Sequence, residues 1–117
     1  MTAFGEVVRG RREALRTADP TYSVRQVAAR IGVQPSFLSK VERGEAPPPS
    51  EAKINALAEV LELDPDVLLA LAGKVSSDLQ DVIRKRPELF GALIRSLRDL
   101  PDQAVVRLVR EVRDGDW

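Results

Sequence analysis

The chain has 117 residues, of which 44% are hydrophobic and 31% are charged. This balance suits one compact soluble domain, or a small domain with an appendage, and it argues against disorder. Because cysteine and histidine are both absent, disulfides, thiolate or imidazole metal sites and histidine-dependent catalytic triads are excluded. We therefore expect no metal and no cofactor, and we expect that the protein is not an enzyme.

The 18 basic and 18 acidic side chains cancel in number but are unevenly distributed. Residues 1–43 hold eight Lys or Arg and four Asp or Glu, and residues 44–117 hold ten and fourteen. A basic N-terminal part suits a DNA-binding surface, with ordinary solvated charge as the alternative. The sequence contains neither an 18-residue apolar run nor an apolar signal segment, so we expect a cytoplasmic protein that is not embedded in a membrane.

Every strongly periodic segment has the spacing of an α-helix, and strand-type alternation is absent. The first predicted helix runs from about Ala3 to Arg16, with Thr2 as its N-cap. The segment 17–22 contains Asp19 followed by proline and is predicted to be a loop, which either reaches a DNA backbone or only spans a gap.

Two short helices with a tight turn between them are predicted directly after this loop. Ser23 and Gln26 fit a capping box at the start of the first helix, and Gly32 ends it because glycine readily adopts a positive φ. Pro35 opens the second helix. The inward positions are apolar, and Ala28 is small where two steeply crossing helices approach most closely. The pattern indicates a helix-turn-helix, with an ordinary two-helix corner as the alternative.

Five further helices are predicted in the rest of the chain. After the proline-rich connector 45–49, Ser50 caps a fourth helix, and Asp64 with the following proline begins a short fifth helix that ends near Gly73. Three amphipathic helices follow, the first over residues 78–86 and the others opened by Pro87 and Pro101. Helices of this length are marginal alone, so their apolar stripes must pack on each other, on the first five helices or on a second chain.

The segment SVRQVAARIGVQPSFLSKVERGE closely resembles the helix-turn-helix of the lambdoid repressor and Cro superfamily, usually called the XRE family, and LSKVERGE is especially typical. The following PPPSEAKINALAEVLELDPDVLLALAG is similar to the last two helices of the same five-helix domain. The resemblance covers roughly residues 4–73. It implies an all-α fold, with a five-helix lambda-repressor-like DNA-binding domain at 1–74 and a C-terminal helical dimerisation or interaction region at 75–117.

The resemblance implies that the third helix, over residues 35–43, enters the major groove while the second lies across the phosphate backbone. Gln34 either reads adenine or caps this helix, Phe37 packs on a thymine methyl or on the domain edge, and Lys40 reads guanine or contacts only phosphate. Unlike the more polar residues common in the family, Pro35 and Phe37 cannot make bidentate base contacts. The groove-facing candidates are Gln34, Pro35, Ser36, Phe37, Ser39 and Lys40.

The family pattern also implies contacts away from the bases. Phosphate contacts are expected from the backbone near Val24 and from Arg25, Arg43 and Arg11. In the resembling family, an arginine of the first helix pairs with the glutamate of the ERG-type stretch. The matching residues here are Arg12 and Glu42, and the resemblance implies a partly buried, bidentate ion pair that holds the third helix against the first.

The resemblance implies a sequence-specific regulator of transcription, expected to be a repressor, that binds double-stranded DNA as a homodimer because one short helix reads about half a site. The C-terminal helices suit dimerisation, with an intramolecular core or a docking surface for another protein as alternatives. A second class of function stays open, namely an antitoxin or adaptor whose C-terminal helices bind a toxin or a metallopeptidase. The candidates for these contacts are Leu89, Phe90, Leu93, Ile94, Leu97, Val105, Leu108, Val109 and Val112.

Overall fold

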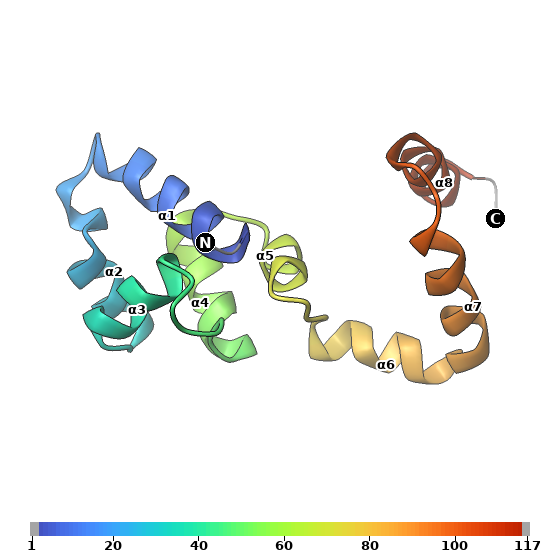
Figure 1. The fold of residues 1–117 in the computed structure, drawn as a ribbon, viewed down its shortest axis with the longest axis horizontal. Coiled ribbons are helices and arrows are strands. Elements are labelled where there is room, and N and C mark those ends of the chain that lie inside the picture. The colour runs from blue at the N-terminus through green and yellow to red at the C-terminus, as the bar shows by residue number, and fades with distance from the viewer. Residues whose placement is uncertain (1–2, 116–117) are drawn as a thin grey trace. The chain divides into compact units, whose positions relative to one another are not determined.

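The structure is a computed structural model that describes residues 3–115. Over these residues all of its regular elements are helices and it contains no strand, which confirms the predicted all-α class (Figure 1). The predicted N-cap Thr2 lies outside the described residues. In chain order the elements are α1 (Ala3–Arg16), the 3-10 helix η1 (Pro20–Tyr22), α2 (Val24–Ile31), α3 (Pro35–Glu42), α4 (Glu51–Leu61), α5 (Pro65–Leu71), α6 (Ser77–Lys85), α7 (Pro87–Arg98) and α8 (Asp102–Asp114).

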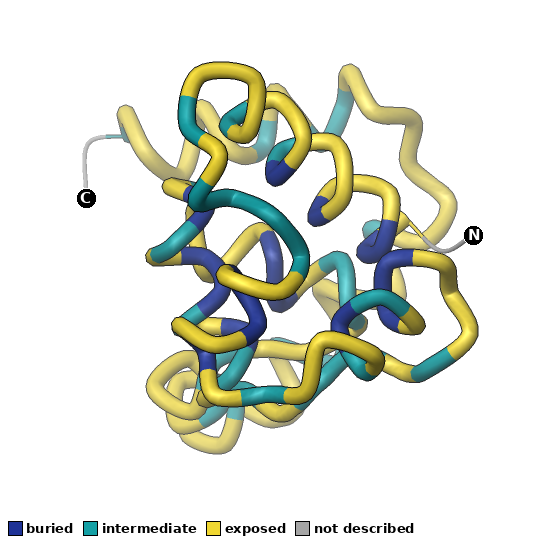
Figure 2. Tube along the Cα trace, turned by 90° about the vertical axis from the view of Figure 1, so that its left-hand side faces the viewer, coloured by how far each residue is buried: buried dark blue, intermediate teal, exposed yellow. Residues whose placement is uncertain are grey.

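The chain divides after Ser76 into a first unit, which holds α1 to α5, and a second unit, which holds α6 to α8. The boundary predicted from the sequence, after residue 74, lies two residues before this division. The first unit has one apolar core, to which all five of its α-helices contribute buried side chains (Figure 2). Its members are Phe4, Val8, Val27, Ala28, Ile31, Leu38, Val41, Ile54, Leu57, Ala58, Leu61, Leu68 and Leu69.

Local hydrogen bonds explain where α2 begins and ends. The Ser23 hydroxyl accepts a hydrogen bond from the Gln26 N–H at 3.2 Å, as an N-cap should. The other half of the predicted capping box does not form, because the Ser23 N–H donates to the carbonyl of Pro20 at 3.3 Å instead. At the other end, Gly32 adopts a φ of 74°, the left-handed conformation that ends a helix and that glycine tolerates best.

The segment predicted as a loop contains the short helix η1. A carboxylate oxygen of Asp19 accepts hydrogen bonds from the Thr21 hydroxyl at 2.7 Å and from the Thr21 N–H at 2.9 Å. These hydrogen bonds lower the pKa of Asp19 below its ordinary value. Because the folded-state pKa is lowered, the stabilisation from Asp19 is present above the pKa of the unfolded chain and is lost as the pH falls through the folded-state pKa.

A glycine sets the contact between α1 and α3. A Cβ atom on Gly5 would lie 2.6 Å from the carbonyl oxygens of both Val41 and Glu42, which is too close for any side chain. Because these acceptors belong to the backbone at the end of α3, neither can rotate away. Glycine at this position therefore allows α1 to lie directly against the last turn of α3.

The second unit contrasts with the first in its burial. None of its described residues, 77–115, is buried. Large apolar residues remain on its surface, among them Leu89, which is 70% exposed, and Val112, which is 59% exposed. Its described residues therefore form three amphipathic helices without a buried core of their own.

Candidate nucleic-acid interface

The turn between α2 and α3 is closed by hydrogen bonds from two directions. Within the turn, the Val33 N–H donates to the carbonyl of Ala28 at 3.0 Å. From α4, the Lys53 ammonium donates to the carbonyls of Ile31 at 2.9 Å and Gly32 at 3.3 Å. A cation at these carbonyls satisfies acceptors that the end of α2 leaves free and interacts favourably with the helix dipole. Lys53 was not predicted from the sequence, because it lies more than twenty residues from the carbonyls that it holds.

The outer face of α3 presents polar side chains to solvent while its inner face packs into the core. Ser36 and Lys40 are exposed, whereas Leu38 and Val41 are buried. Two residues ahead of Ser36, Gln34 occupies the N-cap position of α3 without a side-chain capping hydrogen bond. The capping role that was the alternative for Gln34 is therefore not seen, and its exposed side chain remains on the outer face.

Pro35 and Phe37 of α3 have structural roles, one at the start of the helix and the other in packing against the core. Pro35 is the first residue of α3, where a proline's missing N–H costs nothing and its fixed φ suits the helix. Phe37 is partly buried and packs against the core cluster, which is the position expected from its domain-edge alternative. Neither residue presents a hydrogen-bonding side chain to the outer face.

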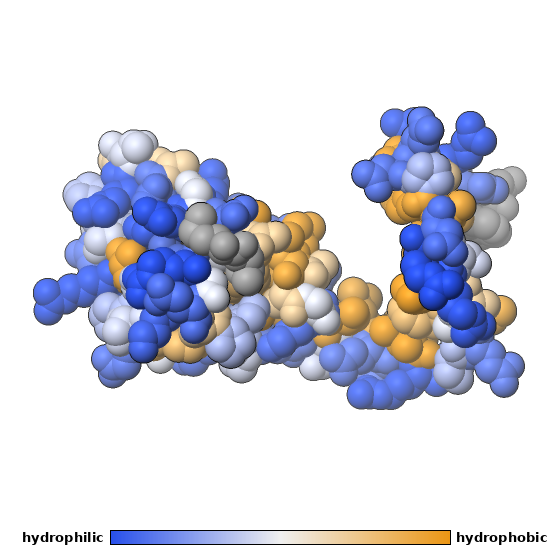
Figure 3. All heavy atoms as spheres, viewed as in Figure 1, coloured by the Kyte–Doolittle hydropathy of each residue, from blue (hydrophilic) through white to orange (hydrophobic). Residues whose placement is uncertain are grey.

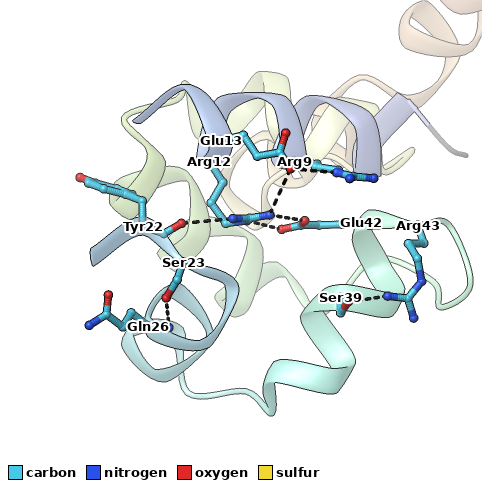
Figure 4. A network of polar contacts seen from close by, with 9 residues as sticks. All are labelled: Arg9, Arg12, Glu13, Tyr22, Ser23, Gln26, Ser39, Glu42 and Arg43. Carbon is cyan, nitrogen blue, oxygen red and sulfur yellow. Dashed lines mark hydrogen bonds and ion pairs between the residues drawn. The ribbon is translucent and has the colours of Figure 1, made fainter. Parts of the chain in front are cut away.

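Arg43 directly follows α3 and joins two neighbouring side chains. Its guanidinium donates to the hydroxyl of Ser39 and, at 3.0 Å, to the carboxylate of Glu45. The hydrogen bond with Glu45 raises the pKa of Arg43 and, reciprocally, lowers the pKa of Glu45. Arg43 nevertheless stays exposed, and Figure 4 shows it beside Ser39 at the end of α3.

The structure brings Arg12 of α1 and Glu42 of α3 together in a bidentate ion pair. The Arg12 Nε and Nη2 donate to the two carboxylate oxygens of Glu42 at 2.7 and 2.9 Å, and both residues are only 3% exposed. The Arg12 Nη1 also donates to the carbonyl of Tyr22 at 3.2 Å (Figure 4). The hydrogen bond with Glu42 is the main cause of the raised pKa of Arg12. This pair fixes α1, η1 and α3 relative to one another.

A polar hollow of about 160 Å³ lies next to this ion pair. As the first residue of α2, Val24 has a backbone N–H without an intrahelical acceptor, and Arg9 and Arg43 supply cations around it. Sequence reasoning missed Arg9, although its position three residues before Arg12 places both on one side of α1. The residues lining the hollow are Arg9, Arg12, Glu13, Val24, Ser39, Glu42 and Arg43.

The other two predicted phosphate contacts lie elsewhere on the first unit. Arg25 is exposed in the first turn of α2 and does not line the hollow. Arg11 Nε donates to the carbonyl of Leu61 at 2.8 Å, and its Nη2 lies 3.6 Å from the carboxylate of Glu62. Arg11 is thus held at the C-terminal end of α4 by residues fifty positions away in the sequence, and we do not include it in the interface.

The predicted dimer or partner residues are gathered within the second unit. Phe90 is partly buried there, while Leu89 and Ile94 are exposed. The other six candidates line one apolar hollow between α7 and α8, and they are Leu93, Leu97, Val105, Leu108, Val109 and Val112.

Two further properties of residues 3–115 concern metal ligands and membrane spans. In this range the structure has no group of three or more Asp or Glu side chains placed to hold a metal ion. Likewise, no helix within it is both long enough and apolar enough to span a bilayer.

Comparison with known proteins agrees with the geometry of α2 and α3. A family model described as a helix-turn-helix domain matches residues 3–71, which is more than half of the chain. The chain belongs to the XRE-like family of helix-turn-helix regulators. One relative, the uncharacterised HTH-type transcriptional regulator RghRB of Bacillus subtilis (strain 168), is 30% identical over 107 residues, which cover 92% of this chain and 70% of the relative. No solved structure matches the chain.

Proposed function

We propose that the protein is a sequence-specific repressor of transcription that acts in the cytoplasm as a homodimer and reads the major groove with α3. The observation that carries this proposal is that Gln34, Ser36 and Lys40 are exposed along α3. The end of the same helix lines the hollow that Arg9 and Arg43 flank. A helix of this size fits the major groove, and cations beside it suit the phosphates that border the groove. The role is one of binding rather than catalysis.

Within this proposal, base contacts and phosphate contacts come from different residues. Gln34 suits adenine, which offers one donor and one acceptor in the major groove, and Lys40 suits the two acceptors of guanine. Arg9 and Arg43, with the Val24 N–H, bind a phosphate at the hollow. These contacts set the register of α3 but carry no sequence information themselves.

Both proposed phosphate-binding arginines are paired with carboxylates in the free protein. Arg9 lies 3.2 Å from Glu13, and Arg43 lies 3.0 Å from Glu45. Ion pairs on the surface contribute little, typically ~0–1 kcal/mol, because water and salt screen them. A DNA phosphate can therefore displace Glu13 and Glu45 at small cost. The buried pair of Arg12 and Glu42 stays intact and keeps α3 in position.

Two copies are needed because one α3 covers only about half of an operator. A homodimer places two reading helices on half-sites one turn of DNA apart, about 34 Å. Repression follows where such a site overlaps the start of a gene, since the bound dimer excludes polymerase.

Replacing Arg43 with alanine should weaken binding to all DNA sequences and lower the slope of log K against log salt by about one, because one phosphate contact is lost. Replacing Lys40 with alanine should instead reduce the preference for the correct site by about 1–3 kcal/mol if Lys40 contacts a base. Fluorescence anisotropy with DNA from upstream of the protein's own gene, and with a shuffled duplex, measures both effects over a range of salt concentrations.

The matched control is Arg11→Gln, which removes a cation that α4 holds away from the hollow, and it should leave the salt slope unchanged. Equal effects of Arg43→Ala and Lys40→Ala on both duplexes would contradict the assignment of α3 as the reading helix. Weak binding with no preference between the duplexes, even for the unaltered protein, would favour a protein-interaction module over a repressor.

A further inference from the structure

The two arginines that flank the hollow beside α3 each donate to a carboxylate in the free protein. The Arg9 Nε donates to Glu13 Oε1 at 3.2 Å, and the Arg43 Nη2 donates to Glu45 Oε2 at 3.0 Å. In formal charge, the two glutamates cancel the two arginines. Figure 3 shows hydrophilic side chains gathered over α1 and α3 on the face of the first unit that is turned toward the viewer. This face is rich in charge, but the cations beside the hollow are neutralised until a ligand replaces the carboxylates.

Glu13 places its carboxylate between two arginines of the hollow. Its Oε1 lies 3.2 Å from Arg9 Nε and 3.9 Å from Arg12 Nη2 (Figure 4), and Glu13 itself lines the hollow. Guanidinium groups bind carboxylates and phosphates through the same N–H donors. An Arg9 N–H that donates to Glu13 is therefore withheld from a phosphate. The Glu13 side chain is 53% exposed, so it can turn into solvent without disturbing the core.

Glu45 acts on a second pair of cations at the other end of α3. The hydrogen bond from Arg43 is the main cause of the lowered pKa of Glu45, and the charge of Lys40 lowers this pKa further. Because the attraction is mutual, Glu45 draws on both the proposed phosphate contact and the proposed guanine contact. Its side chain is 57% exposed and free to leave. By contrast, the side chains of Arg12 and Glu42 are each only 4% exposed, so their pair is not open to exchange.

We propose that Glu13 and Glu45 are intramolecular competitors of DNA. Each carboxylate holds an arginine that a phosphate must take over, so the protein binds every duplex more weakly than its cations alone would allow. The proposal rests on the proposed function for the identity of the ligand, a DNA phosphate. Phosphate contacts carry no sequence information. The competition at Glu13 therefore sets the strength of binding, while the groove-facing side chains of α3 set the preference among sequences.

Glu13→Gln in the full chain tests the competition, because it removes the charge and keeps the size of the side chain. At low salt it should raise the affinity for DNA from upstream of the protein's own gene by about two- to fivefold, within the range of a surface ion pair. A shuffled duplex should gain by the same factor. Both gains should shrink as salt screens the exposed charges. Glu45→Gln should also tighten binding to both duplexes, and fluorescence anisotropy measures each affinity.

The matched control is Glu62→Gln, which releases Arg11 from an exposed ion pair and changes the net charge by the same amount. Arg11 follows Arg9 by two residues, about 200° around α1, and neither Arg11 nor Glu62 is among the residues that line the hollow. The affinity of this control for both duplexes should change by less than about 1.5-fold, since salt screens charges outside the contact.

A second background shows whether the competition acts through the arginine. In Arg9→Gln the cation that Glu13 holds is absent. Adding Glu13→Gln to this variant should then raise the affinity for DNA by much less than it does in the unaltered chain. Comparison of the two gains isolates the interaction between the two residues from their separate effects.

Inorganic phosphate provides a readout that needs no DNA. In nuclear magnetic resonance titrations at constant ionic strength, the Arg9 Nε–H signal of Glu13→Gln should shift at a phosphate concentration about two- to fivefold lower than in the unaltered protein. Glu62→Gln should titrate like the unaltered protein. If no duplex binds to the protein, this titration decides the competition by itself.

The competition is overturned if Glu13→Gln binds DNA no more tightly than Glu62→Gln, or if its gain is the same with and without Arg9. Weaker binding by Glu13→Gln would also overturn it, because Glu13 would then orient Arg9 for DNA. Equal gains on both duplexes, without any preference for the upstream sequence, would uphold the competition and count against the proposed function alone. A preference for the upstream duplex with an affinity that Glu13→Gln leaves unaltered would count against the competition alone.

Discussion

Replacement of Arg12 with methionine is expected to lower the free energy of unfolding by about 3–5 kcal/mol, as the loss of one partner from a buried ion pair generally does. Methionine keeps the apolar stem of the side chain but removes the guanidinium. The carboxylate of Glu42, which is 3% exposed, then stays buried without its cation, and the Tyr22 carbonyl loses a donor. Urea unfolding of the full chain, followed by helical circular dichroism, measures the change.

Two further variants show whether the unpaired charge is the cause. In Arg12→Met/Glu42→Leu no charge is left buried, and most of the stability should return. In Arg9→Met an exposed pair with Glu13 is lost, and the stability should change by less than about 0.5 kcal/mol. A loss below about 1 kcal/mol in Arg12→Met, set against the expected range, would mean that water or another cation reaches Glu42.

Gly5→Ala is expected to destabilise the protein by about 1–3 kcal/mol, in the range typical of overpacking. Helix propensity alone predicts the opposite, since alanine in a helix interior is favoured over glycine by about 1 kcal/mol. The added Cβ would lie 2.6 Å from the carbonyl oxygens of Val41 and Glu42, and α1 would have to move away from α3. The Arg12–Glu42 pair spans the same two helices and would be stretched.

The matched control for this variant is Gly10→Ala in the same helix. A Cβ on Gly10 has no neighbouring atom within 4 Å, so this substitution should stabilise the protein by about 0.5–1 kcal/mol through helix propensity alone. Urea unfolding of both variants gives the comparison. If Gly5→Ala were as stable as Gly10→Ala, the close approach of α1 to α3 would be wrong.

Local chemistry made most of the first unit predictable from its sequence. Ser23, Gly32 and Pro35 act on the backbone within a few residues, so that the starts and ends of α2 and α3 follow from residue type and order. The inward apolar positions of these helices repeat at helical spacing and are buried, except for Val24, which is only partly buried. The Arg12–Glu42 contact was implied by family resemblance alone, since thirty residues separate the two positions.

The contacts missed by sequence reasoning all depend on distant parts of the chain. Lys53 meets the turn carbonyls through the packing of α4 against α2, and Gly5 is needed only because α3 crosses α1 there. Arg11 was predicted to contact phosphate, and the contacts that its guanidinium makes with Leu61 and Glu62 at the end of α4 were not predicted. Helix periodicity fixes which side of its own helix a residue occupies, but not which neighbour that side meets.

For the second unit, the sequence predicts the helices but not the contacts of their apolar faces. Its helices follow from Pro87, Pro101 and the spacing of apolar residues, as the sequence predicts. Helix periodicity places their apolar side chains on one face of each helix, but it does not identify the surface that packs on that face.

Selection of bound duplexes from a pool of random oligonucleotides tests the central claim, that α3 reads operator DNA in the major groove. The account predicts enrichment of one near-palindromic sequence whose half-sites lie about one helical turn, or 34 Å, apart. It also predicts that the protein carrying Lys40→Ala enriches a changed half-site at the same spacing. A pool that stays random after repeated rounds, or an enriched sequence that is the same for both proteins, would contradict it.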